Sequence, residues 1–128
     1  MKERATVVCW AGSWVLLVTR ERGRWSLPGG TLKREESPPA AARRELWEET
    51  SVDASQMTYL FTFGGLNKQH HVFEVRLDRD TRVAPANEIR QCRWFHHSAV
   101  GQLNTSIPTK QIVELAFRAM RHSTVRKS

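Results

Sequence analysis

Apolar residues in this chain gather in short runs rich in β-branched and aromatic side chains, and Gly or polar residues separate the runs. Residues 4–10 and 13–19 form two such runs around Ala11-Gly12, which predicts a β-hairpin. A second hairpin is predicted across Gly64-Gly65. The expected strands beyond the first hairpin are 25–27, 57–63, 71–77 and 91–95.

Two segments show the start signals and the spacing of amphipathic helices. Ser37 before Pro38 is an N-cap with proline at the first helical position, which predicts a helix over 38–50. Its core-facing stripe is expected at Ala42 and Leu46, with Pro39 in line one turn earlier. Pro108 opens the second helix. Its apolar residues recur at helical spacing: Ile112, Val113, Ala116, Phe117 and Met120.

Strands and helices therefore interleave, which predicts an α/β fold with a helix on each side of a sheet. A length of 128 residues suits one domain, 1–128, with an expected disordered tail at 123–128. No apolar run approaches the ~20 residues that a membrane span needs. The net charge of +7 favours anionic partners, although scattered bases also fit an ordinary solvated surface.

The two cysteines, Cys9 and Cys92, lie inside apolar runs and have no metal-ligand spacing. We expect buried free thiols, which are typical of the reducing cytoplasm.

Three carboxylates stand at i, i+3 and i+4 within the first predicted helix: Glu45, Glu48 and Glu49. This spacing places them on one helix face, and no basic residue follows Glu45 or Glu48 at four positions. Two interpretations remain at this point. The face is either a solvated acidic surface or a site for a hard cation such as Mg²⁺, with Mn²⁺ as a substitute.

The carboxylates belong to a longer pattern over residues 30–52: Gly30, five residues, Glu36, seven residues, then Arg44-Glu45-Leu46-Trp47-Glu48-Glu49-Thr50-Ser51-Val52. This pattern resembles the Nudix box, and it departs from the box only at Ser51, where the family has glycine. The run from 25 to 30 also resembles the segment that leads into the box. At position 51, glycine suits a left-handed residue that ends the helix, so we expect the backbone of Ser51 to be slightly strained.

The resemblance implies a Nudix-type α/β/α sandwich, with a mixed β-sheet between helices. It also implies an enzyme that hydrolyses a nucleoside diphosphate linked to some group X. By position, it implies that Glu45, Glu48, Glu49 and the Gly29 carbonyl bind the metal. Gly30, Glu36 and Arg44 would support these ligands from behind, with Glu36 and Arg44 as an ion pair. An ordinary surface pair is the alternative for those two residues.

Four other residues are candidates for the site. Glu88 precedes 89–95, which resembles a late strand of MutT-like members, and it is either a metal ligand or general base or a solvated loop residue. Glu45 is the other candidate base. Phe61, Phe63 and Trp94 are the aromatic residues expected near a substrate pocket.

We therefore predict a MutT-like pyrophosphohydrolase acting on nucleoside triphosphates, normal or oxidised. One alternative keeps the chemistry but changes the substrate to an RNA 5′ end or a dinucleoside polyphosphate, for which steep salt dependence would speak. A non-catalytic module that senses nucleotides is an alternative of another class. On this resemblance, residues 30–52 contact only the phosphates and the metal. They therefore identify neither the nucleobase of the substrate, nor the bond that is cleaved, nor the oligomeric state.

Overall fold

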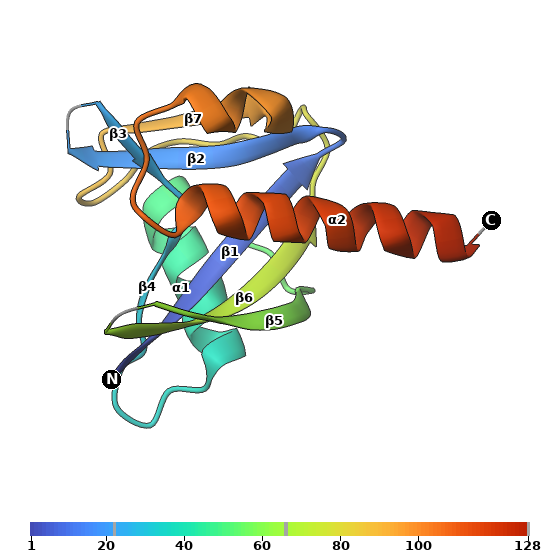
Figure 1. The fold of residues 1–128 in the computed structure, drawn as a ribbon. Helices are drawn as coiled ribbons and strands as arrows, with labels where there is room; N and C mark the ends of the chain where they lie inside the picture. The colour runs from blue at the N-terminus through green and yellow to red at the C-terminus, as the bar shows by residue number, and fades with distance from the viewer. Residues whose placement is uncertain (22, 66, 128) are drawn as a thin grey trace.

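The computed structural model describes residues 1–21, 23–65 and 67–127, without the side chains of 21 and 123–127. The strands are β1 (Lys2–Ala11), β2 (Trp14–Glu21), β3 (Arg24–Ser26), β4 (Gly29–Thr31), β5 (Thr58–Gly64), β6 (Lys68–Arg76) and β7 (Gln91–His96). The helices are α1 (Pro38–Thr50), the short 3₁₀ helix η1 (His97–Gln102) and α2 (Thr109–Lys127). Figure 1 shows their arrangement.

One mixed sheet organises these elements. Its strand order is β3-β2-β1-β6-β5, with β4 paired to β1 and β7 paired to β2. β1 and β6 are parallel along nine residue pairs, whereas β1 meets β2 only beside their hairpin. β4 therefore pairs with the first half of β1, where β2 has turned away to pair with β3 and β7.

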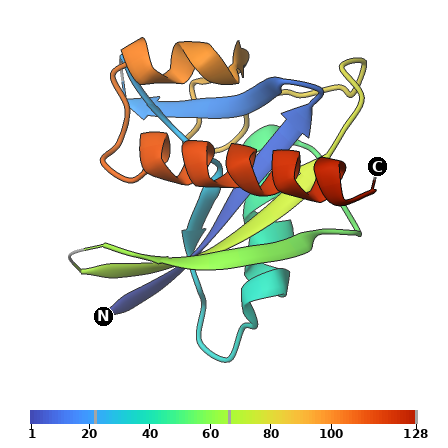
Figure 2. The same cartoon turned by 45° about the vertical axis from the view of Figure 1, so that its right-hand side comes forward.

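The two long helices cover opposite faces of the sheet, as Figures 1 and 2 show. This confirms the predicted fold class. Strand alternation explains the two cores: Ala5 and Val7 of β1 pack toward α1, while Val8 and Trp10 pack toward α2. The sheet is thus buried along much of both faces, and each face has its own apolar cluster.

α1 begins as predicted, because the Ser37 hydroxyl accepts a hydrogen bond from the Ala40 N–H. The predicted stripe was partly wrong. Pro39 is exposed, and Ala41 is buried instead, beside Ala42 and Leu46. Pro39 lies in the first turn of α1, whereas Ala41, Ala42 and Leu46 further along the helix join the apolar cluster on this face.

Other expectations need correction. The Gly29-Gly30 break forms strand β4, and residues 97–102 form a 3₁₀ helix that the sequence analysis did not predict. The expected tail at 123–128 is helical through Lys127, and Ser128 lies outside the described residues. Cys9 is a buried free thiol as expected, but Cys92 is only half-buried.

Candidate active site

Two glycines of β4 allow close approach, Gly29 to strand β1 and Gly30 to Glu45 of α1. Gly29 has a φ of +151°, and a Cβ atom there would come within 2.2 Å of the Ala5 carbonyl oxygen. A Cβ on Gly30 would lie 2.5 Å from the Glu45 carboxyl group. Side chains at either position would therefore push β4 away from β1 or push Glu45 away from β4. Gly29 therefore allows β4 to approach β1, and Gly30 leaves space for the Glu45 carboxylate.

Arg44 binds three carboxylates, two from α1 and one from the loop before it. Its Nε donates to Glu36 Oε2 at 2.7 Å and its Nη2 to Glu36 Oε1 at 2.9 Å. Nη1 reaches Glu45 Oε1 at 2.8 Å and Glu48 Oε1 at 3.3 Å. The hydrogen bonds from Arg44 hold the pKa of Glu36 down at about 2. The expected ion pair between Glu36 and Arg44 is present, and it also fixes two of the proposed ligands.

Glu49 is the most enclosed carboxylate of the motif, with 1% of its surface exposed. Its Oε1 accepts from the Gly29 N–H at 3.0 Å, and its Oε2 pairs with the Arg20 guanidinium. Arg20 also donates to the Gly29 carbonyl oxygen at 2.8 Å. Burial raises the pKa of Glu49 to about 7, although the charge of Arg20 and the Gly29 N–H act in the opposite direction.

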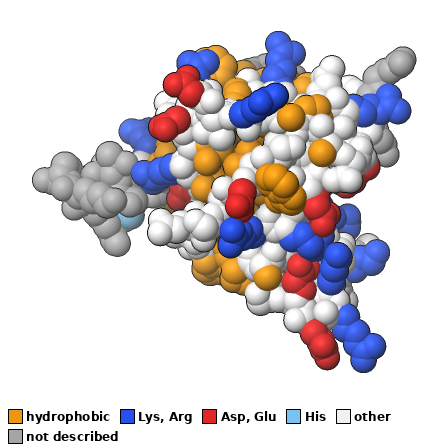
Figure 3. Space-filling view, turned by 180° about the vertical axis from the view of Figure 1, so that it is seen from behind, with side chains coloured by type: hydrophobic (Ala, Val, Ile, Leu, Met, Phe, Trp, Pro, Cys, Tyr) orange, Lys and Arg blue, Asp and Glu red, His pale blue; other side chains and the backbone are white. Residues whose placement is uncertain are grey.

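The expectation of an acidic face without basic partners was therefore wrong. Arg44 lies four residues before Glu48 rather than after it, and Arg20 reaches Glu49 from strand β2. Figure 3 looks at the α1 side of the molecule, where basic and acidic side chains lie next to one another. In the part of the chain that the structure describes, no three His, Cys, Asp or Glu side chains converge as a metal-binding group. Arginines now occupy the carboxylate oxygens.

A cleft opens on the α2 face of the sheet, with a volume of about 740 Å³. Four of its described lining residues are cationic: Arg4, Arg20, Arg24 and Lys68. Arg20 lines this cleft and also pairs with Glu49, so it joins the cleft to the carboxylates of α1. An anion in the cleft would therefore lie next to the motif.

A model of the NUDIX domain matches residues 2–115 of this chain. The chain belongs to the Nudix family. The mouse protein named diphosphoinositol polyphosphate phosphohydrolase 3-alpha is 37% identical over 87 residues, which cover 64% of this chain and 47% of the relative. The chain thus spans about half the length of the curated relatives it matches.

Solved structures share the fold. A MutT/nudix family protein from Enterococcus faecalis matches with a TM-score of 0.84 and 18% identity, over 94% of this chain and 62% of that chain. The NUDIX domain of Shewanella oneidensis NrtR, complexed with ADP ribose, matches with a TM-score of 0.83 and 20% identity, over 94% and 88%. None of the helices in the described part of the chain has the length and apolar character of a membrane span.

The one departure from the Nudix box adopts the conformation that we expected. Ser51 ends α1 with φ 64° and ψ 19°, and its N–H donates to the Trp47 carbonyl oxygen at 3.0 Å. Its hydroxyl also donates to the Ala84 carbonyl oxygen at 3.1 Å. Ser51 therefore offsets its left-handed strain with a hydrogen bond that glycine could not make.

Glu88 lies beside the box but is largely open to solvent. Its side chain is 58% exposed, and its Oε1 lies 4.0 Å from Arg20 Nε. The preceding Asn87 donates from Nδ2 to the Glu48 carbonyl oxygen at 2.6 Å, which ties this loop to the end of α1. The role of Glu88 as a metal ligand or general base stays a prediction.

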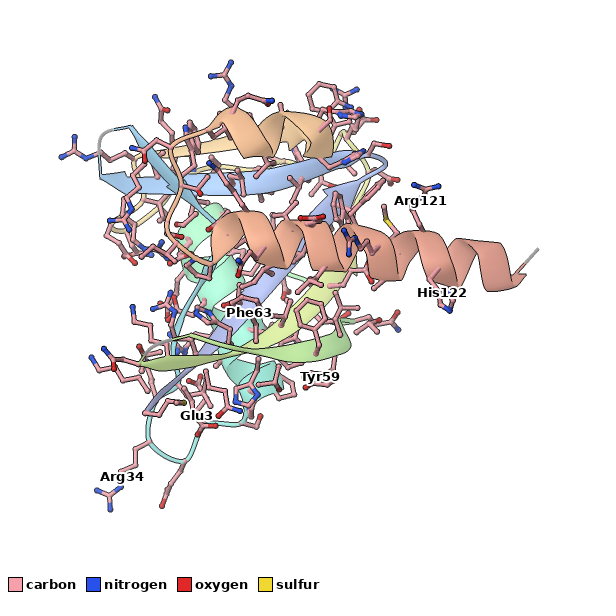
Figure 4. All side chains as sticks on the ribbon, in the orientation of Figure 1. Glu3, Arg34, Tyr59, Phe63, Arg121 and His122 are labelled. Atoms are coloured by element: carbon pink, nitrogen blue, oxygen red, sulfur yellow. The ribbon has the colours of Figure 1, made fainter. Side chains whose placement is uncertain are left out.

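The aromatic candidates separate in the structure. Phe63 lines the cleft, and Figure 4 shows it between β5 and α2. Phe61 packs into the core under α2, and Trp94 packs against the core on the α1 side. Trp94 therefore lies on the wrong face of the sheet for the cleft.

Sequence reasoning missed the cleft residues Arg4 and Arg20. Strand alternation could have placed Arg4 on the face of Val8 and Trp10, which pack under α2. No local signal identifies Arg20, because its partner Glu49 is 29 residues away.

Proposed function

We propose that this chain is a metal-dependent pyrophosphohydrolase that cleaves a pyrophosphate bond in a nucleoside di- or triphosphate-type substrate, as MutT-like proteins do. The observation that carries the proposal is the position of Arg20. It lines the cationic cleft and pairs with Glu49 of the box, so a phosphate chain bound by the cleft would lie beside the carboxylates. Family membership supports this assignment.

The residues present fit a divalent cation such as Mg²⁺ or Mn²⁺. The proposed ligands, Glu45, Glu48, Glu49 and the Gly29 carbonyl, offer only oxygen atoms, which hard cations prefer. Gly30 leaves room for the Glu45 carboxylate. When bound, the metal would neutralise phosphoryl charge and lower the pKa of a water.

The protein groups around this site have separate roles in the proposal. Glu36 and Arg44 hold Glu45 and Glu48 in place through their shared hydrogen bonds. Arg20 would exchange Glu49 and the Gly29 carbonyl for a substrate phosphate, because the metal competes for the same oxygens. Either Glu45 or Glu88 would take the proton of the attacking water.

The test is a screen of nucleoside di- and triphosphates, oxidised nucleotides, ADP-ribose and dinucleoside polyphosphates with Mg²⁺. Phosphorus NMR in ¹⁸O-labelled water identifies the bond that breaks and the phosphorus attacked. We expect hydrolysis that stops on chelation and returns when Mg²⁺ is added. Activity that survives complete chelation would overturn the metal assignment.

A second substrate class has support from the cleft. Its four cations suit a heavily phosphorylated substrate, such as a dinucleoside polyphosphate or an RNA 5′ end. The mouse relative carries the name of a diphosphoinositol polyphosphate phosphohydrolase, which adds that substrate to the screen. A non-catalytic sensor of nucleotides is less well supported, because all three box carboxylates are present.

A further inference from the structure

The α2-facing side of β1 and β6 has an apolar half and a polar half. Val8, Trp10 and Val72 lie in the core under α2. Toward the start of both strands the same face carries Arg4 and His70, which are register partners and line the cleft. The helix α2 begins at Thr109, and Ser106, Ile107 and Pro108 of the segment before it also line the cleft. The cleft is therefore the part of this face that α2 leaves open.

Arg4 is a cation without an anionic partner among the described side chains. Its side chain is partly buried, yet no carboxylate in the described part of the chain lies within ion-pair distance of it. Burial and the nearby charge of Arg20 both lower the pKa of Arg4, and Glu49 and Glu45 only partly oppose this. A buried charge is costly unless it is paired, so Arg4 would gain from an anionic ligand.

Two further cations extend this charge away from the box. Arg24 of β3 and Lys68 of β6 line the same cleft, and neither forms an ion pair with another described residue. The first turn of α2 contains no acidic residue, so the positive end of its dipole is not neutralised there. These groups line the cleft, and Arg20 lies between the cleft and Glu49.

The cleft offers little to a nucleobase. Phe63 is the only Phe, Tyr or Trp among its described lining residues, so a base could stack on one such ring at most. His70 is held by a 2.9 Å hydrogen bond between its Nδ1 and Thr6 Oγ1. Burial lowers the pKa of His70 to about 4, so its imidazole is neutral at pH 7 and suits a hydroxyl group.

We propose that Arg4, Arg24 and Lys68 form a second phosphate-binding subsite, which holds a phosphate on the X part of the substrate. This subsite is separate from the position of the pyrophosphate that is cleaved beside the box. The inference rests on the proposed function and makes it more specific, because X is then itself phosphorylated. Arg20 lies between the two positions and would contact the phosphate chain that joins them.

The experiment measures binding of inositol hexakisphosphate by calorimetry, without metal and at low salt. This probe carries several phosphates but no pyrophosphate bond, so its binding is independent of hydrolysis. Each of R4Q and K68Q should weaken binding by about tenfold, the loss expected for one charge-assisted hydrogen bond. The matched control is R34Q, because Arg34 is exposed and projects away from the cleft in Figure 4. It loses the same charge and should leave affinity within about twofold.

Two outcomes overturn the subsite. Equal weakening by R4Q, K68Q and R34Q would mean that the probe responds only to net charge. Tighter binding of single-stranded RNA with increasing length, and a salt slope that falls with each variant, would assign the cations to an RNA backbone.

The proposed function is tested separately in the same samples. If R4Q and K68Q weaken the probe but no pyrophosphate substrate is hydrolysed, the subsite stands and the proposed activity fails. If hydrolysis is found and both variants bind the probe as the wild type does, the activity stands and the subsite fails.

Discussion

The two faces of the sheet treat charge in opposite ways. On the α1 face, all four carboxylates of the motif have arginine partners: Glu36, Glu45 and Glu48 share Arg44, and Glu49 pairs with Arg20. On the α2 face, Arg4, Arg24 and Lys68 line a cleft and form no ion pair within the described chain.

The comparison shows that the charges of the motif on the α1 face are paired within the protein, whereas most described charges of the cleft on the α2 face are not. The acidic groups are held in place by internal hydrogen bonds, and two of them are largely buried without an unpaired charge. Three of the four cleft cations, Arg4, Arg24 and Lys68, have no ion-pair partner among the described side chains. A polyanionic substrate would balance the second face, and a divalent cation would exchange with arginines on the first.

The largest expected effect is on catalysis at the balanced face. E49Q and E48Q each replace a charged oxygen ligand with a neutral amide and should lower kcat by several orders of magnitude. The control is E114Q, which removes an exposed carboxylate on α2 and should keep normal activity. Steady-state kinetics at saturating Mg²⁺ measures the effect, with circular dichroism to show that each variant folds. Near-normal rates in E49Q would mean that the carboxylates are only structural.

Glu88 tests whether the site extends beyond the α1 face. If Glu88 is the base, E88Q should lower kcat by about 10²-fold with little change in KM, because general base catalysis acts in the transition state. The acidic limb of the pH–rate profile should disappear as well. An unchanged kcat and pH profile would remove Glu88 from the mechanism and leave Glu45 as the candidate base.

The sequence alone predicted the parts of this site that are local. α1, its Ser37 cap and the left-handed Ser51 depend on neighbours within a few residues, so motif and propensity suffice. The strand β4 was missed because Gly29-Gly30 becomes a strand only by pairing with β1.

The cleft was missed for a related reason. Its cations come from β1, β2, β3 and the start of β6, which only the folded sheet brings together. Phe61 and Phe63 both pack against the cluster under α2, and only the folded structure shows that Phe63 alone also lines the cleft.

Substitutions on the two faces should also differ in their effect on the free energy of unfolding. R44M leaves three carboxylates without their partner, and we expect a loss of about 2–4 kcal/mol in the free energy of unfolding, measured with urea. The neighbouring R43M breaks only the exposed pair with Asp53 and should cost less than about 1 kcal/mol. R4Q removes an unpaired cation and should leave stability unchanged or raise it. A large loss in R4Q would reveal an internal partner and remove the contrast.

Acid titration tests the Glu36–Arg44 pair, and the expected change in stability is smaller than that of R44M. Since Arg44 lowers the pKa of Glu36 to about 2, the ionised carboxylate stabilises the fold above the pKa of the unfolded chain. That contribution should fall as the pH decreases from about 4.5 toward 2. Urea unfolding across this range should show a steeper decline in the wild type than in R44M. Parallel curves would show that Arg44 does not lower the pKa of Glu36.

The smallest effect concerns the residue where α1 leaves the family pattern. S51G relieves a left-handed serine, worth up to about 1 kcal/mol, but it also deletes the hydrogen bond from Ser51 to the Ala84 carbonyl oxygen, worth about 0.5–1.5 kcal/mol. The two contributions oppose each other, so we expect a net change in stability within about 0.5 kcal/mol. S51A keeps the strain and loses the bond, so it should be less stable than S51G by about 1 kcal/mol. Urea unfolding of both variants separates the contributions, and the Mg²⁺ dependence of activity should be the same in both, because Ser51 supplies no ligand. If S51A were as stable as the wild type, the hydroxyl would have no role in ending α1, and the serine would be only a tolerated replacement for glycine.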